Sequence, residues 1–462
     1  MRSKQHCSNA LRQPRAAIHT LGCPKNTVDS DALGRVLGGA GFELVQQESK
    51  ADILIINTCG FLDDAKIESV QVLLEAIRWK AKKPGRRVLA MGCLTQRDGA
   101  EIHAEMPELD GVFGIGEWSR MIEALGSNPL SLGNDTHEEL EAAGEAGPGS
   151  AYLRISDGCS HACAFCSIPQ MRGLYRSEPI ERLVAQANIL AERGIRELIL
   201  IGQETTSYGV DLYRRRRIVE LCNRLSEIEG IHWIRMLYAH PPTCPPELMK
   251  ELARVPKLAP YIDFPIEHAS DRVLKLMNRR TTALKMRKAI DVFRSELPDA
   301  CIRTTILVGF PGETDEDFEA LYNFMSEVQF ERAGVFTYSP QQGTTGATLS
   351  NRVEQGIALD RLDRLMNLQR YIMREKHKAR IGRLLEVLIE KQHKDISWGR
   401  SAWDAPGIDA RVRIPGQFVP GTIVRASVVK ASAYQLDAMV DSHSGLSNQG
   451  DLCAFSEFSL LS

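Results

Sequence analysis

Three cysteines lie within eight residues of the chain, at positions 159, 163 and 166, directly after the strand-like segment 151–155. Their C-x3-C-x2-C spacing brings together three soft thiolates, which are the ligands that iron–sulfur clusters take. Three thiolates can hold a 4Fe-4S cubane and leave its fourth iron without a protein ligand, so that this iron can bind a small molecule. The segment is therefore predicted to hold a cluster that does chemistry, since a fully ligated cluster would only carry electrons.

Zinc is the main alternative for this segment, because His161 could complete a set of four tetrahedral ligands with the three cysteines. Only one residue separates His161 from Cys159 and from Cys163, however, and such close neighbours would strain a tetrahedral site. Disulfide-bonded or simply buried cysteines are a weaker alternative. Iron–sulfur ligation is the preferred interpretation.

Three further cysteines follow predicted strands in the N-terminal part of the chain. The segments 17–21, 52–57 and 87–91 have strand-like apolar runs, and 69–79 has the apolar spacing of a helix. Each of these runs is followed two residues later by a cysteine, namely Cys23, Cys59 and Cys93. Ligands gather at the carboxyl ends of the strands in an open parallel sheet. The three cysteines are therefore expected to converge on a second cluster, although each alone could be a small buried hydrophobic residue.

The middle of the chain alternates strand-like runs with helical segments. The six strand-like runs are 152–155, 197–201, 233–237, 261–266, 302–308 and 334–338. Six consecutive βα units predict a parallel barrel that is incomplete, since eight units close a full one. A helix over 359–378 follows these units.

Chemistry in parallel barrels takes place on the loops at the carboxyl ends of the strands. The cysteine loop follows the first strand, Gln203 and Glu204 follow the second, and Gly309 and Gly312 follow the fifth, which itself carries Arg303. All of these residues are expected at one mouth. For the glycines a simple turn is an equal alternative, for Gln203 and Glu204 a solvated loop, and for Arg303 an ion pair within the barrel.

These patterns predict an α/β fold with an open N-terminal sheet, a partial (β/α)6 barrel and a small antiparallel C-terminal β-barrel. The predicted ranges are a disordered extension (1–15), an α/β domain (16–126), a linker rich in Gly, Glu and Ser (127–150), the barrel with its closing helix (151–378), the β-barrel (379–441) and a tail (442–462).

Composition narrows the class of protein. The 462 residues are 43% hydrophobic and 25% charged, with a formal net charge of −2, which argues against disorder and against bulk electrostatic binding to nucleic acid. The longest apolar runs are strand-sized, so no membrane span is expected. Six of the eleven cysteines are assigned to clusters, which implies a reducing cytoplasm. The basic N-terminus is similar to an organelle transit peptide, but a cytosolic extension is the preferred interpretation.

The order of these domains resembles the radical S-adenosylmethionine (SAM) methylthiotransferase family over about residues 16–440, and the last barrel resembles a TRAM domain. The segment Gly22-Cys23-Pro24-Lys25-Asn26 is similar to the RimO-like branch rather than to the tRNA-modifying, MiaB-like branch, which reads Gly-Cys-Gln-Met-Asn. The stretches 168–173 and 336–340 also agree with the RimO-like branch. Gln170 and Glu267 depart from it, where serine and glutamine are usual.

The resemblance implies an enzyme that uses two 4Fe-4S clusters and SAM. Cys159, Cys163 and Cys166 would hold the cluster that cleaves SAM, and Cys23, Cys59 and Cys93 an auxiliary cluster that presents sulfur. The residues implied in SAM binding are Phe165, Gln203, Glu204, Arg303, Gly309 and Gly312. No catalytic side chain beyond the cluster ligands is assigned.

The same resemblance implies a substrate. The methylthio group would go to the β-carbon of an aspartate on small-subunit ribosomal protein twelve, free or in the ribosomal subunit, with an electron donor such as flavodoxin or ferredoxin. Methylthiolation of a tRNA adenosine is the less favoured alternative. A non-catalytic Fe-S protein or an RNA-binding protein is the alternative from a different class.

Overall fold

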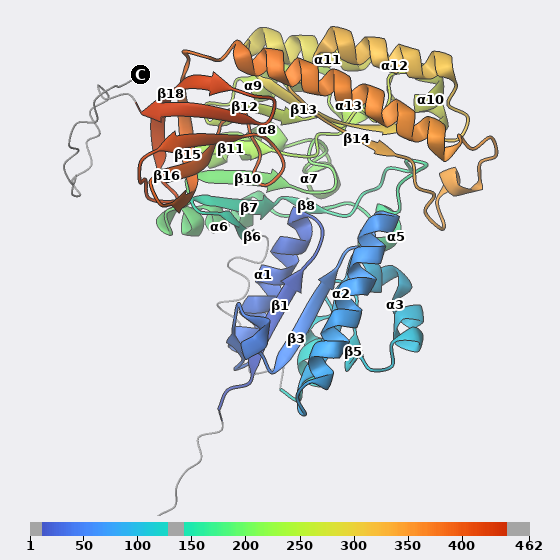
Figure 1. The fold of residues 1–462 in the computed structure, drawn as a ribbon, viewed down its shortest axis with the longest axis vertical. Coiled ribbons are helices and arrows are strands. Elements are labelled where there is room, and N and C mark those ends of the chain that lie inside the picture. The colour runs from blue at the N-terminus through green and yellow to red at the C-terminus, as the bar shows by residue number, and fades with distance from the viewer. Residues whose placement is uncertain (1–11, 128–142, 441–462) are drawn as a thin grey trace, which may run out of the picture.

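The computed structural model describes residues 12–127 and 143–440. Most of the predicted N-terminal extension, the whole of the tail after residue 441 and much of the predicted linker therefore lie outside the described residues. Figure 1 shows the N-terminal domain below the central sheet, and the C-terminal barrel packed against that sheet at the left of the view.

The N-terminal domain is a parallel sheet of five strands in the order β2-β1-β3-β4-β5. Its strands are β1 (Arg15–Thr20), β2 (Glu43–Leu44), β3 (Ile53–Thr58), β4 (Arg87–Gly92) and β5 (Gly111–Val112). Its helices are α1 (Pro24–Gly39), α2 (Asp63–Ala81), α3 (Cys93–Glu105) and α4 (Trp118–Ala124), with a 3-10 turn at Glu48–Lys50. Every residue of β3 is buried, because helices cover both faces of a parallel sheet. The predicted open α/β sheet is confirmed.

The central sheet has seven strands in the order β14-β13-β12-β11-β10-β7-β6. Its parallel strands are β7 (Ser150–Arg154), β10 (Glu197–Ile201), β11 (Trp233–Met236), β12 (Leu258–Asp263), β13 (Cys301–Val308) and β14 (Arg332–Thr337). These six strands match the six predicted runs, so the partial parallel barrel is confirmed. The short pair β8 (Ser156–Asp157) and β9 (Arg176–Ser177) stands beside it.

The helices that follow these strands cover the outer face of the sheet (Figure 1). They are α6 (Ile180–Glu192), α7 (Val210–Tyr213), α8 (Ile218–Ser226), α9 (Pro246–Ala253), α10 (Asp271–Leu276), α11 (Ala283–Glu296), α12 (Asp315–Val328) and α13 (Gln355–Lys378). The short helix α5 (Ile168–Arg172) packs instead against α3 of the N-terminal domain. Two 3-10 turns, Pro241–Thr243 and Thr345–Thr348, complete the domain. Leu198 and Leu200 of β10 pack among these helices, whereas Ile199 and Ile201 pack on the other face with residues of the C-terminal barrel. This alternation is the period-2 pattern of a strand buried on both faces.

The predicted linker over 127–150 is wrong for its last residues. Ala143–Gly147 forms strand β6, which pairs antiparallel with β7 at the edge of the central sheet. The segment lacks apolar periodicity because α1 packs closely against it and leaves room only for glycine at position 144. A Cβ on Gly144 would lie 3.0 Å from the Cα of Val28 in α1. A strand that a neighbouring helix covers this tightly cannot be recognised from hydrophobic periodicity alone.

The C-terminal domain is a closed barrel in the order β15-β16-β17-β19-β18. Its strands are β15 (Leu384–His393), β16 (Ile396–Ser401), β17 (Arg411–Pro415), β18 (Ile423–Ala431) and β19 (Gln435–Val440). The predicted small β-barrel is confirmed, with one difference: β17 and β19 pair in parallel, whereas an antiparallel barrel was predicted. Five strands cannot alternate in direction around a closed ring, so one parallel pair is required. Across residues 12–127 and 143–440, no helix is both long and apolar enough to cross a membrane.

Candidate active site

The first cysteine set lies at the carboxyl ends of three neighbouring strands. Cys23 stands just before α1, Cys59 directly follows β3, and Cys93 is the first residue of α3 after β4. The loops approach each other so closely that a Cβ on Gly22 would lie 2.8 Å from the Sγ of Cys59. The structure thus brings together three cysteines that are far apart in the sequence.

The thiols of this set influence one another. Burial raises the pKa of Cys93 to about 11, and the neighbouring Cys23 and Cys59 add to the rise while Arg172 opposes it. Burial likewise raises the pKa of Cys59, again with a contribution from Cys23. A bound metal outweighs this effect of burial on the thiol pKa values, because a coordinating thiol loses its proton outright. The chemistry of the three side chains therefore fits a thiolate-ligated cluster.

Two asparagines hold these loops in place. The Nδ2 of Asn26 donates to the carbonyls of Leu21 (2.8 Å) and Thr58 (3.1 Å), and the Nδ2 of Asn57 donates to the carbonyl of Asn26 (2.9 Å). Both residues are fully buried. Asn57 is not among the residues predicted from sequence, and the signal that could have found it is an asparagine inside a strand-like apolar run that ends at a cysteine.

The second cysteine set lies in one loop between β8 and α5. The loop is fastened by backbone hydrogen bonds from Cys159 N to Gly173 O (3.1 Å) and from Cys166 N to Cys163 O (3.1 Å). Burial raises the pKa of Cys159 to about 11 and that of Cys166 to about 12, with Cys163 contributing to both. Arg279 also donates through Nη1 to the Sγ of Cys163 at 3.7 Å.

Among the described residues, no three His, Cys, Asp or Glu side chains meet closely enough to chelate a single metal ion. A cubane has a different requirement, because each thiolate binds a different iron and the ligands are spread over the corners of the cluster.

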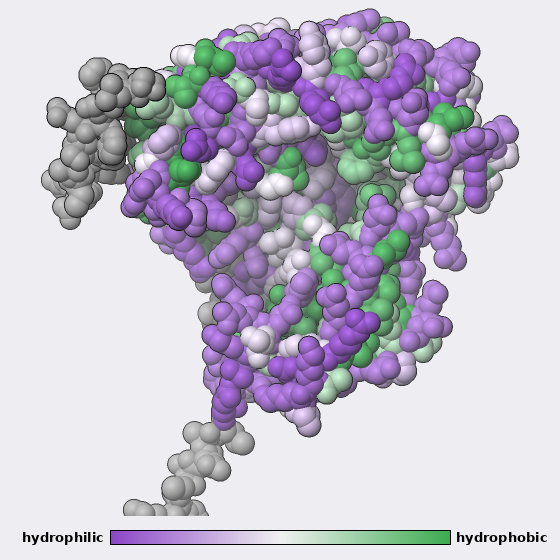
Figure 2. All heavy atoms as spheres, viewed as in Figure 1, coloured by the Kyte–Doolittle hydropathy of each residue, from purple (hydrophilic) through white to green (hydrophobic). Residues whose placement is uncertain are grey.

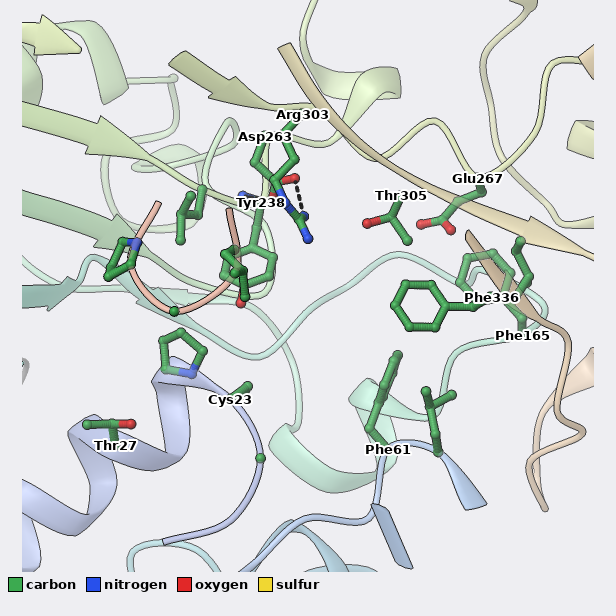
Figure 3. A pocket seen from close by; sticks show the side chains of 18 of the residues that line it. Cys23, Thr27, Phe61, Phe165, Tyr238, Asp263, Glu267, Arg303, Thr305 and Phe336 are labelled. Atoms are coloured by element: carbon green, nitrogen blue, oxygen red, sulfur yellow. Dashed lines mark hydrogen bonds and ion pairs between the residues drawn. The ribbon is translucent and has the colours of Figure 1, made fainter. Parts of the chain in front are cut away.

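A cavity of about 580 Å³ lies between the two cysteine sets, and all three domains line it. The N-terminal domain contributes Cys23 and Phe61, the cysteine loop of the central domain contributes Phe165, and the C-terminal barrel contributes Ile408. Figure 3 shows Cys23 and Tyr238 toward one end, and the rings of Phe61, Phe165 and Phe336 gathered at the other. Figure 2 shows the surface hollowed on this face, where the N-terminal domain meets the central sheet. The volume suits an organic ligand larger than a single ion.

Charged residues of the central sheet also line this cavity. Arg303 points into it from β13, with Nη1 3.1 Å from Asp263 Oδ1 (Figure 3). Its Nε lies 3.6 Å from Asp409 Oδ1. It is therefore both an ion-paired arginine and a cavity residue. Tyr238 and Glu267 line the cavity with φ of 60° and 65°. A positive φ costs free energy in residues other than glycine, and residues with such backbone conformations cluster at functional sites.

Glu204 lies outside the lining of this cavity but next to the second cysteine loop. Its Oε1 accepts hydrogen bonds from the Ser207 amide (2.8 Å) and from the Thr206 hydroxyl. Its Oε2 is buried without a hydrogen-bond partner among the described residues, and the nearby Nε2 of His161 lies 3.7 Å away. A buried carboxylate oxygen without a hydrogen bond is suited to accept one from a cationic group of a ligand. Gln203 lies beside it, near Asp157, and is also absent from the cavity lining.

Gly309 and Gly312 form a turn that faces α13. Their φ values are 75° and 86°, and a Cβ on Gly309 would lie 2.7 Å from the Cβ of Ala358. The Gly309 amide donates to Glu313 Oε2 at 2.5 Å. Turn geometry and close packing account for both glycines, and neither lines the cavity, so their part in cofactor binding stays a prediction.

Family models match three segments of the chain. Residues 153–325 match the radical SAM superfamily, residues 15–114 match an uncharacterized protein family named UPF0004, and residues 381–440 match the TRAM domain. In the solved structures, the radical SAM methyltransferase TsrM from Kitasatospora setae has a similar fold, with a TM-score of 0.54 at 13% identity, over 72% of this chain and 77% of that one. The fold and the three-cysteine loop define a protein of the radical SAM superfamily.

Curated relatives narrow this class. The chain is 42% identical over 405 residues to ribosomal protein uS12 methylthiotransferase RimO of Thermoanaerobacter sp. (strain X514), covering 86% of this chain and 92% of that protein. It is 39% identical over 408 residues to the protein of that name in Clostridioides difficile (strain 630), covering 86% and 92%. The chain belongs to the RimO family of ribosomal protein uS12 methylthiotransferases. The predicted family and branch are confirmed.

Proposed function

We propose that this chain transfers a methylthio group to the β-carbon of an aspartate on ribosomal protein uS12, by radical SAM chemistry with two 4Fe-4S clusters. Family membership supports the reaction. The observation that carries the proposal for this chain is the cavity between the two cysteine sets, which Cys23 lines from one set and Phe165 lines from within the other. A substrate in that cavity would contact residues from both cysteine-bearing segments.

The six cysteines are the proposed cluster ligands. Cys159, Cys163 and Cys166 would hold the cluster that binds SAM, and Cys23, Cys59 and Cys93 the auxiliary cluster. When bound, these groups supply a 5′-deoxyadenosyl radical, which removes hydrogen from an unactivated carbon, and the sulfur that takes its place. No side-chain acid or base could deprotonate such a carbon at a useful rate.

The other residues of the chain bind, orient and exclude water. The Oε2 of Glu204, which makes no hydrogen bond among the described residues and lies 3.7 Å from the Nε2 of His161, would accept a hydrogen bond from the SAM ammonium group, with Gln203 beside it. Phe61, Phe165 and Phe336 line one end of the cavity with apolar surface, which would limit the access of water to a radical once a substrate is bound. Arg303 is the cavity-lining cation that would face a carboxylate, of SAM or of the target aspartate. Gly309 and Gly312 would shape the neighbouring turn.

Substrate and surroundings follow from the same proposal. The protein uS12, free or in its ribosomal subunit, is the proposed partner. Radical formation consumes an electron, so a donor such as flavodoxin or ferredoxin is required, and six free thiols call for a reducing compartment such as the cytoplasm. A tRNA substrate is disfavoured by the net charge of −2, because a tRNA enzyme needs several phosphate contacts.

Competition between acceptors tests this function. Anaerobically reconstituted enzyme is given reductant, SAM, a sulfide source, and equal amounts of uS12 and unmodified tRNA, and both acceptors are then analysed by mass spectrometry. The expected result is one methylthio group on an aspartate of uS12 and none on adenosine. Methylthio-adenosine with unmodified uS12 would overturn the substrate assignment. Binding of RNA without any SAM turnover would favour a non-catalytic protein.

A further inference from the structure

Arg172 links the two cysteine sets. It is the last residue of α5, the short helix that follows Cys166 and packs against α3 (Figure 1). Its side chain is only 1% exposed. The Nη2 of Arg172 donates to Asp29 Oδ2 at 2.7 Å, to Asn26 Oδ1 at 2.9 Å and to the Sγ of Cys93 at 3.5 Å.

The partners of Arg172 belong to segments that carry both sets of cysteines. Asn26 and Asp29 lie in α1, which begins directly after Cys23. On the other side, the Nη1 of Arg172 lies 3.6 Å from Asp157 Oδ1, two residues before Cys159. One guanidinium therefore contacts both cysteine-bearing regions, which lie in different domains.

A buried guanidinium requires nearby negative charge, because an uncompensated charge in the interior is costly. Asp29 and Asp157 supply this charge from the two sides, and Arg154 of β7 also contacts Asp29, with Nη1 2.5 Å from Oδ1. Two arginines and two aspartates thus form a balanced network. Arg172 donates to the sulfur of Cys93. Arg154 pairs with Asp29 and contacts no cysteine sulfur among the described residues.

We propose that Arg172 is a positioning residue that fixes the first cysteine set against the second, and that its hydrogen bond to Cys93 raises the reduction potential of the auxiliary cluster. Reduction adds negative charge that the ligating sulfurs share, so a cationic N–H donor beside one sulfur stabilises the reduced state more than the oxidised state. This inference rests on the cluster ligands assigned under the proposed function.

A redox titration of the auxiliary cluster alone isolates the effect. The parent protein for this test is the full chain with Cys159, Cys163 and Cys166 changed to Ala, so that only the auxiliary cluster remains. Its midpoint potential is measured by electron paramagnetic resonance, with Arg172→Met, Arg172→Lys or Arg154→Met added. Arg154→Met is the matched control, because it also removes a buried arginine from Asp29 but leaves the contact to sulfur.

Arg172→Met is expected to shift the midpoint potential to more negative values, and Arg172→Lys to shift it less, because lysine keeps the charge but not the planar set of donors. Arg154→Met is expected to leave the potential unchanged. An unchanged potential in Arg172→Met, or an equal shift in Arg154→Met, would overturn the inference. If Arg172→Met takes up no cluster, the midpoint potential of Arg172→Lys is the test. A potential more negative than that of the parent protein supports the inference, and a potential equal to it contradicts the inference. If the parent itself takes up no cluster, the ligand assignment fails instead.

Discussion

Glu197 of β10 and Arg400 of β16 form an ion pair across the boundary between the central sheet and the C-terminal barrel. Their side chains are 0% and 2% exposed. The Nε of Arg235 lies 2.8 Å from the other carboxylate oxygen of Glu197, so one carboxylate compensates two buried arginines. The barrel is therefore joined to the sheet by charge as well as by apolar packing.

Glu197→Gln is expected to destabilise the chain by about 3–5 kcal/mol, because removing one partner leaves buried charge uncompensated. Denaturant-induced unfolding at neutral pH measures the loss. Glu220→Gln is the control, since Glu220 pairs with Arg217 on the surface and such pairs contribute at most about 1 kcal/mol. Equal stability of the two variants would contradict the role given to Glu197.

The same carboxylate gives stability a dependence on pH. Burial would raise the pKa of Glu197, but Arg400 and Arg235 outweigh burial and lower the pKa to about 2 from its ordinary 4.5. The folded state therefore favours the ionised form, and this stability is fully present above pH 4.5 and is lost as the pH falls toward 2. The difference in unfolding midpoint between wild type and Glu197→Gln should narrow over this range. A constant difference would show that Glu197 does not titrate as described.

Iron content tests the two-cluster assignment. Reconstituted wild type should hold about eight irons, and the variant with Cys23, Cys59 and Cys93 changed to Ala should hold about four, as expected for two cubanes and for one. Iron and acid-labile sulfide are measured after removal of unbound metal. Full iron content in the triple variant would exclude the auxiliary site, and zinc without iron in wild type would exclude both sites.

The two sites should also fail differently when each loses a ligand. Cys163→Ala should abolish reductive cleavage of SAM, because it removes a ligand of the cluster that binds SAM. Cys59→Ala should still cleave SAM but transfer no methylthio group. Formation of 5′-deoxyadenosine is the readout, with circular dichroism as the control for folding, since loss of a cluster also removes folding free energy. Equal loss of cleavage in both variants would indicate one shared site.

The placement of the cysteines could be predicted from sequence because each follows a strand-like run, and parallel strands end at one edge. The contacts between domains could not. Arg172 meets Asp29 across 143 positions in the sequence, and Arg303 meets Asp409 of the C-terminal barrel, and no local pattern records such pairs. Strand β6 was missed because packing against Val28 selects glycine where periodicity would favour an apolar residue.

The fate of the hydrogen that leaves the acceptor shows whether a 5′-deoxyadenosyl radical attacks the β-carbon of the aspartate. Ribosomal protein uS12 carrying deuterium at the β-carbon of its aspartates is incubated with the reconstituted enzyme, reductant, SAM and sulfide, and the 5′-deoxyadenosine is analysed by mass spectrometry. The expected result is deuterium in 5′-deoxyadenosine and one methylthio group on an aspartate that keeps its carboxylate. Methylthiolated uS12 together with 5′-deoxyadenosine free of deuterium would contradict it.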